Sequence, residues 1–306
     1  MISGEKVLIT GATGTLGNIL GRYLAKENEV WGMARLSDDA SRAKVIDAGM
    51  KPVALDFEQP DFSGVPADFT YVLHLAHTRR GADEFVEAVQ INAVGPGLLL
   101  QHCRNAKAAL VVSSSAVYSP NEDTFHHMRE DEQIGRSFTP WAPSSPVSKV
   151  SLEAVARMAS EAFSLPTTIV RLNTTYGPAQ GIAGGMPVMN LQSIMAGKPV
   201  QTFADPYPHS PIHYDDMCDQ IEALLDAASP RANIVNWCGD EVITQRQWCD
   251  MAAGFCGQPA ELIVNPIPGT PNGAASDNAK RVSITGPCKR PFEPSFRAIF
   301  EALQTE

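Results

Sequence analysis

The first half of the chain alternates short apolar segments with stretches of helical periodicity. Short apolar segments occur at 5–10, 29–34, 51–56, 70–76, 108–114 and 167–172, and the first of them is rich in β-branched residues. Apolar residues at helical spacing occupy 15–27, 82–104 and 146–163. Strands that are apolar along their whole length, each followed by a helix, indicate a parallel sheet that is covered on both faces. We therefore predict a doubly wound α/β domain with a parallel sheet of the Rossmann type.

The pattern changes after about residue 173, and 176–211 is rich in glycine and proline. A helix at 216–227 and an apolar strand at 232–238 are predicted to return to the sheet. Thr244 and Gln247 have the spacing of a capping box and predict a helix over 245–256, and the chain ends in a predicted amphipathic helix. We expect a first domain over 1–173, to which 211–240 returns, and a smaller, discontinuous C-terminal domain over 174–210 and 241–306.

Composition narrows the class of protein. The 306 residues are 44% hydrophobic and 19% charged, with a net charge of −10, as in a globular chain that does not bind nucleic acid or an anionic membrane. No apolar run approaches the ~18 residues that span a bilayer. The six cysteines show neither a C-x-x-C pair nor zinc-ligand spacing, which favours reduced thiols, and no metal site is predicted. The first residues are not typical of a secretory signal, so we expect a cytoplasmic protein.

The segment TGATGTLG places Gly11, Gly14 and Gly17 between the first predicted strand and the first predicted helix. Glycine permits the tight turn and lets backbone N–H groups approach a pyrophosphate at the positive end of the helix. This position in the fold indicates a dinucleotide-binding site. The first domain is therefore predicted to bind the cofactor and the second the substrate.

The residue that follows the second strand selects between the two nicotinamide dinucleotides. NAD sites favour a carboxylate there, for the ribose hydroxyls, whereas an arginine suits the 2′-phosphate of NADP. This chain has Arg35, with Ser37, Arg42 and Lys44 close behind. The sequence thus favours NADP over NAD.

At this point the chain resembles the extended short-chain dehydrogenase/reductases, the NAD-dependent epimerase/dehydratase-like family. The resemblance covers nearly the whole chain. It rests on TGATGTLG, LDF (55–57), HLAH (74–77), INAVG (91–95), SSSAVY (113–118), SPVSKVSLE (145–153), RLNTTYGP (171–178) and PIHYDD (211–216). The resemblance implies an NADP-binding oxidoreductase and a homodimer built on the helices near 82–104 and 146–163.

The resemblance also implies site residues. The cofactor would be bound by Gly11, Thr13, Gly14, Thr15, Leu16, Gly17, Arg35, Asp56, Phe57, Leu75, Ala76, His77, Asn92, Lys149, Leu172 and Asn173. Members of this family use a tyrosine four residues before a lysine as acid and base, with a serine to orient the substrate oxygen. Lys149 and Ser114 match the lysine and the serine. The tyrosine position is Ser145, so the sequence departs from the family at the residue that moves the proton.

Three explanations are open for Ser145. First, chemistry survives by replacement: either a water relays the proton between Ser145, Lys149 and the substrate, or another side chain supplies it. The candidates are His77, His126, His127, Glu130, Asp131, Tyr176, His209 and His213. Second, the reaction has changed class, to an isomerisation, a dehydration or another lyase reaction without net redox change. Third, the chain is a non-catalytic NADP-binding sensor. The first leads to our main expectation, an NADP(H)-dependent oxidoreductase.

The expected substrate is a small non-nucleotide molecule with a carbonyl or hydroxyl group. In nucleotide-sugar members of the family, an arginine four residues before the histidine of the PIHYDD-like motif holds the diphosphate. His209 stands there in this chain, and Arg171, Lys198 and Arg281 are the candidate substitutes. An apolar or aromatic substrate would suit the nearby side chains, and the candidate substrate contacts are Tyr118, Trp141, Tyr176 and His209.

Overall fold

A computed structural model describes residues 2–81, 83–178 and 184–305. The chain divides into two compact units. The first comprises residues 1–117, 141–171 and 218–235, and the second 118–140, 172–217 and 236–306. Among the described residues, none of the helices combines the length and the apolar character that crossing a bilayer requires.

The first unit is built on a seven-stranded sheet of order β11-β6-β5-β4-β1-β2-β3. Its strands are β1 (Lys6–Thr10), β2 (Glu29–Ala34), β3 (Lys51–Ala54), β4 (Tyr71–His74), β5 (Ala108–Ser114), β6 (Thr167–Leu172) and β11 (Asn233–Trp237). β1 pairs in parallel with β2 and β4, in a register that sets Val7 opposite Val30 and Tyr71. The doubly wound parallel sheet predicted from the apolar segments is confirmed.

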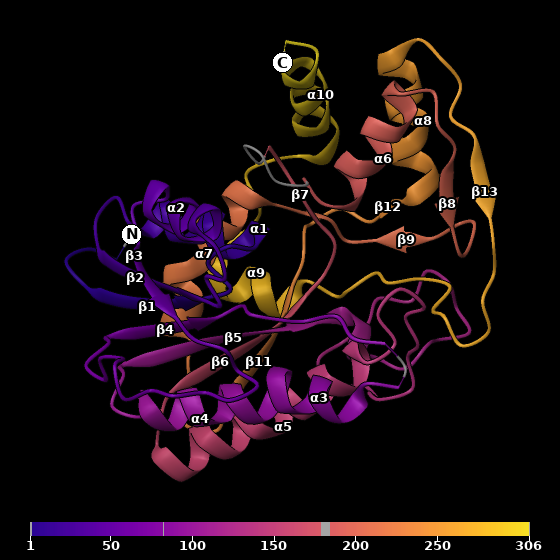
Figure 1. The fold of residues 1–306 in the computed structure, drawn as a ribbon. Helices are drawn as coiled ribbons and strands as arrows, with labels where there is room; N and C mark the ends of the chain where they lie inside the picture. The colour runs from indigo at the N-terminus through magenta and orange to yellow at the C-terminus, as the bar shows by residue number, and fades with distance from the viewer. Residues whose placement is uncertain (1, 82, 179–183, 306) are drawn as a thin grey trace. The chain divides into compact units, whose positions relative to one another are not determined.

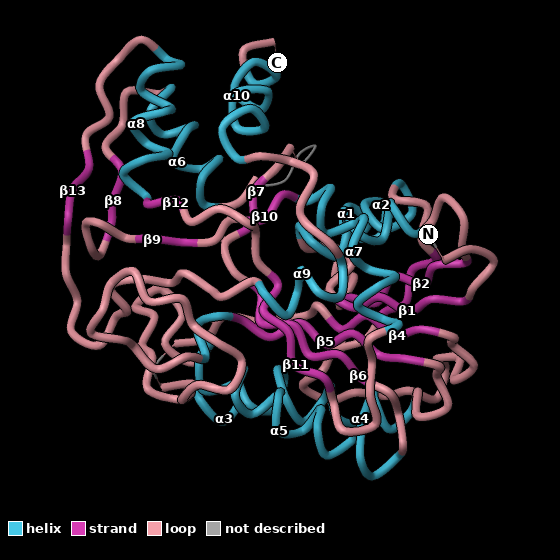
Figure 2. The backbone as a smooth tube through the Cα atoms, turned by 180° about the vertical axis from the view of Figure 1, so that it is seen from behind, coloured by secondary structure: helices cyan, strands magenta, loops and turns pink. Residues whose placement is uncertain are grey.

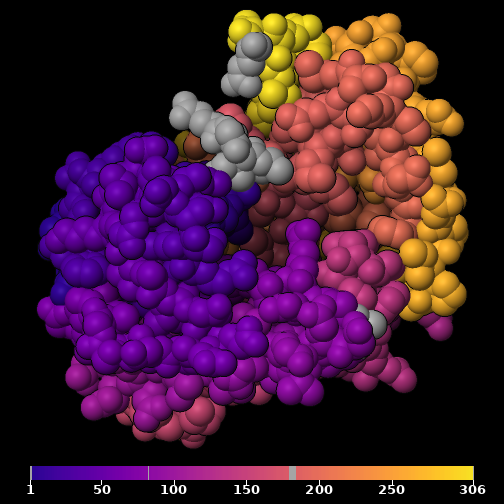
Figure 3. Space-filling model, viewed as in Figure 1, coloured from indigo at the N-terminus to yellow at the C-terminus, as the bar shows by residue number. Residues whose placement is uncertain are grey.

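Helices cover both faces of this sheet (Figures 1 and 2). One face carries α1 (Thr15–Leu24), α2 (Asp39–Asp47) and α7 (Tyr214–Asp226), and the other carries α3 (Phe85–Val89), α4 (Gly95–His102) and α5 (Ser145–Phe163). The 3-10 turn η2 (Ser115–Val117) follows β5. Because both faces are covered, the strands hold fully buried residues such as Leu8, Val72 and Val111. In the space-filling view the N-terminal part of the chain presents a continuous surface, coloured indigo to magenta (Figure 3).

The helix predicted over 82–104 is interrupted. A π-helical turn, η1 (Gln90–Val94), separates α3 from α4. Pro96 has no N–H, so the carbonyl of Asn92 lacks its usual helical partner and the turn widens. The helix predicted near 82–104 is thus present over 85–102 with a π-helical turn inside it, and Asn92 lies within this widened turn.

The second unit has a separate core. Its elements are β7 (Thr175–Tyr176), α6 (Met186–Met195), β8 (Val200–Thr202), β9 (Pro208–His209), β10 (Ile212–His213), β12 (Ile243–Thr244), α8 (Gln245–Cys256), β13 (Leu262–Val264), α9 (Ala279–Thr285) and α10 (Phe292–Leu303). Trp248 of α8 and Phe292 and Phe296 of α10 pack in this core. The capping box between Thr244 and Gln247 is present at the start of α8, as predicted.

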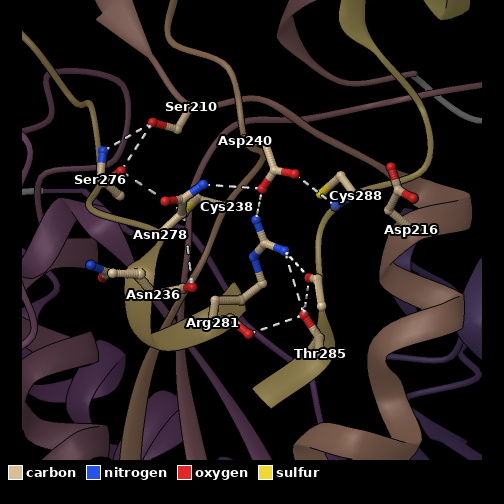
Figure 4. A network of polar contacts seen from close by, with 12 residues as sticks. Ser210, Asp216, Asn236, Cys238, Asp240, Ser276, Asn278, Arg281, Thr285 and Cys288 are labelled. Atoms are coloured by element: carbon tan, nitrogen blue, oxygen red, sulfur yellow. Dashed lines mark hydrogen bonds and ion pairs between the residues drawn. The ribbon is translucent and has the colours of Figure 1, made fainter. Parts of the chain in front are cut away.

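A polar network ties together the loops of the second unit (Figure 4). The fully buried side chain of Arg281 forms an ion pair with Asp240. The same carboxylate accepts hydrogen bonds from the Asn278 side chain (3.0 Å) and from the backbone N–H of Cys288 (2.7 Å). Asp216 accepts a hydrogen bond from the backbone N–H of Lys289 (2.8 Å). These bonds stabilise the segment that precedes α10.

The cysteines are all free thiols, as expected. Several apolar side chains are exposed on the helices for which a dimer is predicted, and Val86, Leu98 and Met158 are 80%, 42% and 53% exposed. The homodimer remains a prediction.

Candidate active site

The candidate site lies in the first unit, where the sheet order reverses. The chain leaves β1 toward β2 and β3 on one side and returns to β4 on the other. In open α/β sheets, ligands bind at the carboxyl ends of the strands at such a switch point. A cavity of about 250 Å³ lies here.

Most of the residues predicted to bind a cofactor line this cavity. They are Gly11, Thr13, Gly14, Arg35, Asp56, Phe57, Leu75, Ala76, His77 and Asn92. Met33, Ala34, Leu55, Glu58, Thr78, Arg80 and Ile91 also line it, and the sequence analysis missed them. Each of these lies within three residues of a predicted one. Six of them follow or end β2, β3 or β4, and Ile91 precedes Asn92 in the π-helical turn, so proximity to the predicted residues could have identified them.

The glycine loop after β1 is shaped for a close ligand. Gly11 has φ +70°, and a Cβ there would lie 3.0 Å from the backbone of Ala76. A Cβ on Gly17 would lie 2.1 Å from the carbonyl oxygen of Gly11. Neither position accepts a side chain without displacing backbone, so the loop stays narrow and its N–H groups stay accessible.

The N-terminus of α1 is available to an anion. Gly14 occupies the N-cap without a side-chain hydrogen bond, and the first turn carries no acidic residue. Within the described parts of the chain, the backbone N–H groups of Thr15, Leu16 and Gly17 have no acceptor, since the first helical bond runs from Asn18 to Gly14. Exposed N–H groups at the positive end of a helix are a binding site for phosphate. These three residues do not line the cavity itself, but the loop fits a pyrophosphate.

Thr10 holds together the two strand ends that border the cavity. Its hydroxyl accepts the N–H groups of Leu75 and Ala76, each at 3.1 Å, and bonds to His74 Nδ1 at 2.9 Å. Burial lowers the pKa of His74 to about 3, so this ring stays neutral. The segment 75–77 is therefore fixed beside the glycine loop.

Arg35 lies at the cavity edge with its side chain exposed. Nothing in the described part of the chain forms a hydrogen bond or an ion pair with its guanidinium. Arg80, on the same cavity, pairs with Glu84 at 2.9 Å and with Glu58 at 4.0 Å. Arg35 is thus a cation available to a ligand, whereas Arg80 already has partners.

Lys149 and Ser145 lie one turn apart on α5. Ser145 is the first residue of the helix, where the missing N–H of Pro146 costs nothing. Lys149 is buried, and its Nζ donates to the carbonyl oxygen of Val112 on β5 at 2.6 Å. Burial lowers the pKa of Lys149 to about 8, and the carboxylate of Glu153 opposes that shift.

A buried ion pair between Glu153 and Arg171 lies one helical turn after Lys149. Arg171 of β6 donates to Glu153 through Nε (2.9 Å) and a terminal nitrogen (2.8 Å), and both side chains are 2% exposed. Ser113 donates its hydroxyl to the same carboxylate at 2.7 Å. Ser114 lies next along the strand, is half-buried, and accepts the N–H of Ala116. The sequence analysis did not identify Glu153, although it lies four residues after Lys149 on α5.

The side chain of His77 contacts that of Ser145. Its ring Nε2 lies 2.8 Å from the Ser145 hydroxyl oxygen. The side chain of His77 is exposed toward the cavity, but partial desolvation of the ring, and then the positive charge of Lys149, lower its pKa and favour the neutral form. Among the candidate proton carriers that the structure describes, His77 is the one that bonds to Ser145.

The other candidates from the sequence lie in the second unit, apart from Trp141, which is 53% exposed on the first. Tyr118 is buried and donates its hydroxyl to Asn236 at 2.6 Å. His209 is buried and bonds through Nδ1 to the Thr174 hydroxyl at 2.8 Å. Asn173 donates to the carbonyl oxygen of Ala274 at 2.6 Å.

Three further candidates lie in the second unit and contact residues of that unit. Tyr176 is buried against Phe292, and His126 bonds to Glu132 at 2.9 Å. Leu172 ends β6 and belongs to the same unit. The roles expected for these residues stay predictions.

Comparison with known proteins decides the family. The model of the NAD-dependent epimerase/dehydratase family matches residues 7–238. The chain belongs to this family. The match spans both the glycine loop and the segment from Ser145 to Lys149.

Curated members of the family include relatives of this chain. The dTDP-glucose 4,6-dehydratase of Neisseria gonorrhoeae is 25% identical over 66% of this chain and 63% of its own length. A probable dTDP-glucose 4,6-dehydratase of Sinorhizobium fredii is 27% identical over 62% of this chain and 59% of its own length. The chain thus spans less than two thirds of the length of these relatives.

Solved structures agree on the fold. The UDP-glucuronic acid 4-epimerase of Bacillus cereus, in complex with UDP-glucuronic acid and NAD, has a TM-score of 0.82 and 21% identity, with 98% of this chain and 99% of that one covered. The UDP-N-acetylglucosamine 4-epimerase of Methanobrevibacter ruminantium has a TM-score of 0.82 and 18% identity, with 99% of each chain covered. At this identity the likeness establishes the fold.

Proposed function

We propose that the chain is an NAD(P)-dependent enzyme that acts on a carbon bearing a hydroxyl or carbonyl group and regenerates its cofactor within each catalytic cycle. The observation that carries this is the open N-terminus of α1 and its glycine loop, beside the cavity that His77 lines. The relatives described above are dehydratases, which supports a cycle without net redox change over the net oxidoreductase expected from the sequence. The bound dinucleotide would supply the hydride acceptor and donor.

The roles of the protein residues follow the resemblance. Lys149 would hold the nicotinamide ribose and bring positive charge to the site. Ser114 would bind the reacting oxygen, and Ser145 would take part in proton transfer where the family has a tyrosine. A serine hydroxyl is far less acidic than a phenol, whose ordinary pKa is about 10, so Ser145 needs assistance.

We favour NADP over NAD because of Arg35. Its guanidinium, which no described residue pairs with, lies at the end of β2 and suits a 2′-phosphate, whereas NAD sites favour a carboxylate at this place. A charge-assisted hydrogen bond of this kind is worth about 1.5–3 kcal/mol, or about ten- to a hundred-fold in affinity.

A second candidate is net oxidation or reduction of a small non-nucleotide carbonyl compound. It is favoured by the absence of the expected diphosphate clamp, since His209 is buried and bonded to Thr174. Of the three possible substitutes, Arg171 and Arg281 are buried and paired with Glu153 and Asp240, and Lys198 is exposed. This observation favours a substrate without a diphosphate.

One experiment separates the two candidates. The purified protein is incubated with NADP⁺ or NADPH and, in turn, dTDP-glucose, UDP-glucuronic acid and a set of apolar ketones and aldehydes. Product is followed by mass spectrometry and the cofactor by absorbance at 340 nm. Product without a lasting absorbance change supports the proposed cycle, and an absorbance change equal to the product formed supports the oxidoreductase. Failure to bind either nicotinamide dinucleotide contradicts both.

A further inference from the structure

His77 and Ser145 belong to segments 68 residues apart in the chain, yet their side chains meet at 2.8 Å. His77 follows β4 and lines the cofactor cavity, while Ser145 begins α5. An imidazole ring therefore contacts the position where the family resemblance places a phenol.

Hydrogen bonds of the residues next to His77 and Ser145 stabilise the contact between these two side chains. The N–H of Thr78 donates to Asn92 Oδ1 (2.8 Å), and Asn92 Nδ2 donates to the carbonyl oxygen of Thr78 (2.9 Å). Two residues further on, the hydroxyl of Ser144 donates to the carbonyl oxygen of Arg80 (3.0 Å) and accepts the N–H of Arg80 (3.3 Å). The strand end that carries His77 is thus joined to the π turn and to the residue before Ser145.

The charges that act on His77 are cationic. Desolvation of the His77 ring lowers its pKa, and the positive charges of Lys149 and then Arg79 add to this effect. The imidazole is therefore neutral in the resting site, with one nitrogen able to accept a proton.

We propose that Ser145 and His77 form a proton relay, in which Ser145 exchanges a proton with the substrate oxygen and His77 exchanges one with Ser145. This rests on the proposed function. Ser145 would touch the reacting oxygen, and His77 is a positioning and relay residue that acts through it.

In this relay the substrate hydroxyl proton would pass to Ser145 Oγ while the Ser145 hydroxyl proton passes to His77 Nε2. The hydrogen of the substrate C–H bond would leave with its electron pair as a hydride, for which a bound oxidised nicotinamide dinucleotide would be the acceptor, and the carbon would become a carbonyl. The positive charge gained by the His77 ring would offset the positive charge that the oxidised dinucleotide loses, so the net charge of the site would not change. In the second half of the cycle the imidazolium returns its proton through Ser145 as the hydride returns.

The first test needs neither substrate nor cofactor. In protein labelled with ¹⁵N-histidine, long-range ¹H–¹⁵N spectra report the tautomer, charge and hydrogen bonding of each ring, and His77→Gln assigns the signal. We expect a neutral His77 ring whose Nε2 shift changes in Ser145→Ala, while exposed His127 is unchanged. An identical His77 signal in wild type and Ser145→Ala would overturn the pairing.

The second test asks whether the pair moves a proton. His77→Ala and His77→Gln are compared with a control histidine outside the site, His102→Ala, whose ring contacts the carbonyl oxygens of Val65 and Pro66, and circular dichroism checks the fold of each. Losing a positioned acid–base group costs about 10²–10⁴-fold in rate, so we expect this loss in kcat measured at saturating NADPH. Free imidazole should restore turnover to His77→Ala. Glutamine can bond to Ser145 but cannot carry the proton, so His77→Gln should remain as slow as His77→Ala.

The outcomes are distinguishable. If wild type turns over a substrate of the panel and His77→Gln is equally fast, the relay is wrong and the proposed function stands. If wild type binds no nicotinamide dinucleotide, the proposed function fails, and the NMR comparison still decides whether the pair exists.

Discussion

Replacing Glu153 by glutamine tests the buried ion pair beneath the site. The carboxylate receives two hydrogen bonds from Arg171 and one from Ser113, and neither charged side chain is more than 2% exposed. The amide keeps the shape of the side chain, but it leaves the guanidinium charge uncompensated and turns a donor toward it. Breaking a buried pair by removing one partner costs about 3–5 kcal/mol, so we expect Glu153→Gln to lower the free energy of unfolding by that amount.

Urea unfolding, followed by tryptophan fluorescence and circular dichroism, measures this loss. The matched control is Glu293→Gln, which breaks the exposed i,i+4 pair with Arg297 and should cost at most about 0.5 kcal/mol. Adding Arg171→Met to Glu153→Gln removes the unpaired cation and should recover part of the stability. A loss below about 1 kcal/mol in Glu153→Gln would refute the reasoning.

Three further predictions concern the site and its surroundings. Arg35→Ser should weaken NADPH binding about ten- to a hundred-fold and leave NADH binding unchanged, as measured by fluorescence titration; equal losses for both would contradict the phosphate contact. The pKa of Lys149 falls from 10.5 to about 8 on folding, so the unfolded chain binds more protons than the folded one between these pH values. The free energy of unfolding of wild type, measured by urea titration, should therefore rise by about 3 kcal/mol relative to that of Lys149→Met from pH 8 to pH 10.5. A constant difference between the two proteins would contradict the burial of this amine. Iodoacetamide should label the partly exposed Cys256 and Cys288 before the buried Cys238, whose pKa burial raises to about 12, and mass spectrometry that found Cys238 labelled first would count against this packing.

Much of the fold follows from local sequence signals. Uninterrupted apolar segments such as 108–114 indicate strands buried on both faces, and Thr244 with Gln247 marks a helix start. The glycine loop could be predicted because the close approach of Gly17 to the carbonyl oxygen of Gly11 permits no other residue. These features depend on neighbours in sequence.

The parts that could not be predicted depend on distant contacts. The π turn at 90–94 arises where Pro96 removes a donor from an otherwise regular helical pattern. The partner of Ser145 could not be identified among several histidines, because the choice of His77 depends on how β4 and α5 are placed. The burial of Glu153 could not be predicted from its position on a helix, because it depends on the ion pair with Arg171 of β6.

The central claim is that the first unit binds a nicotinamide dinucleotide at the switch point of its sheet. Titration of the purified chain with NADPH and NADH, followed by quenching of tryptophan fluorescence, tests it most directly. The account predicts saturable binding of NADPH, at least about ten-fold tighter than that of NADH. No saturable binding of either dinucleotide would contradict it.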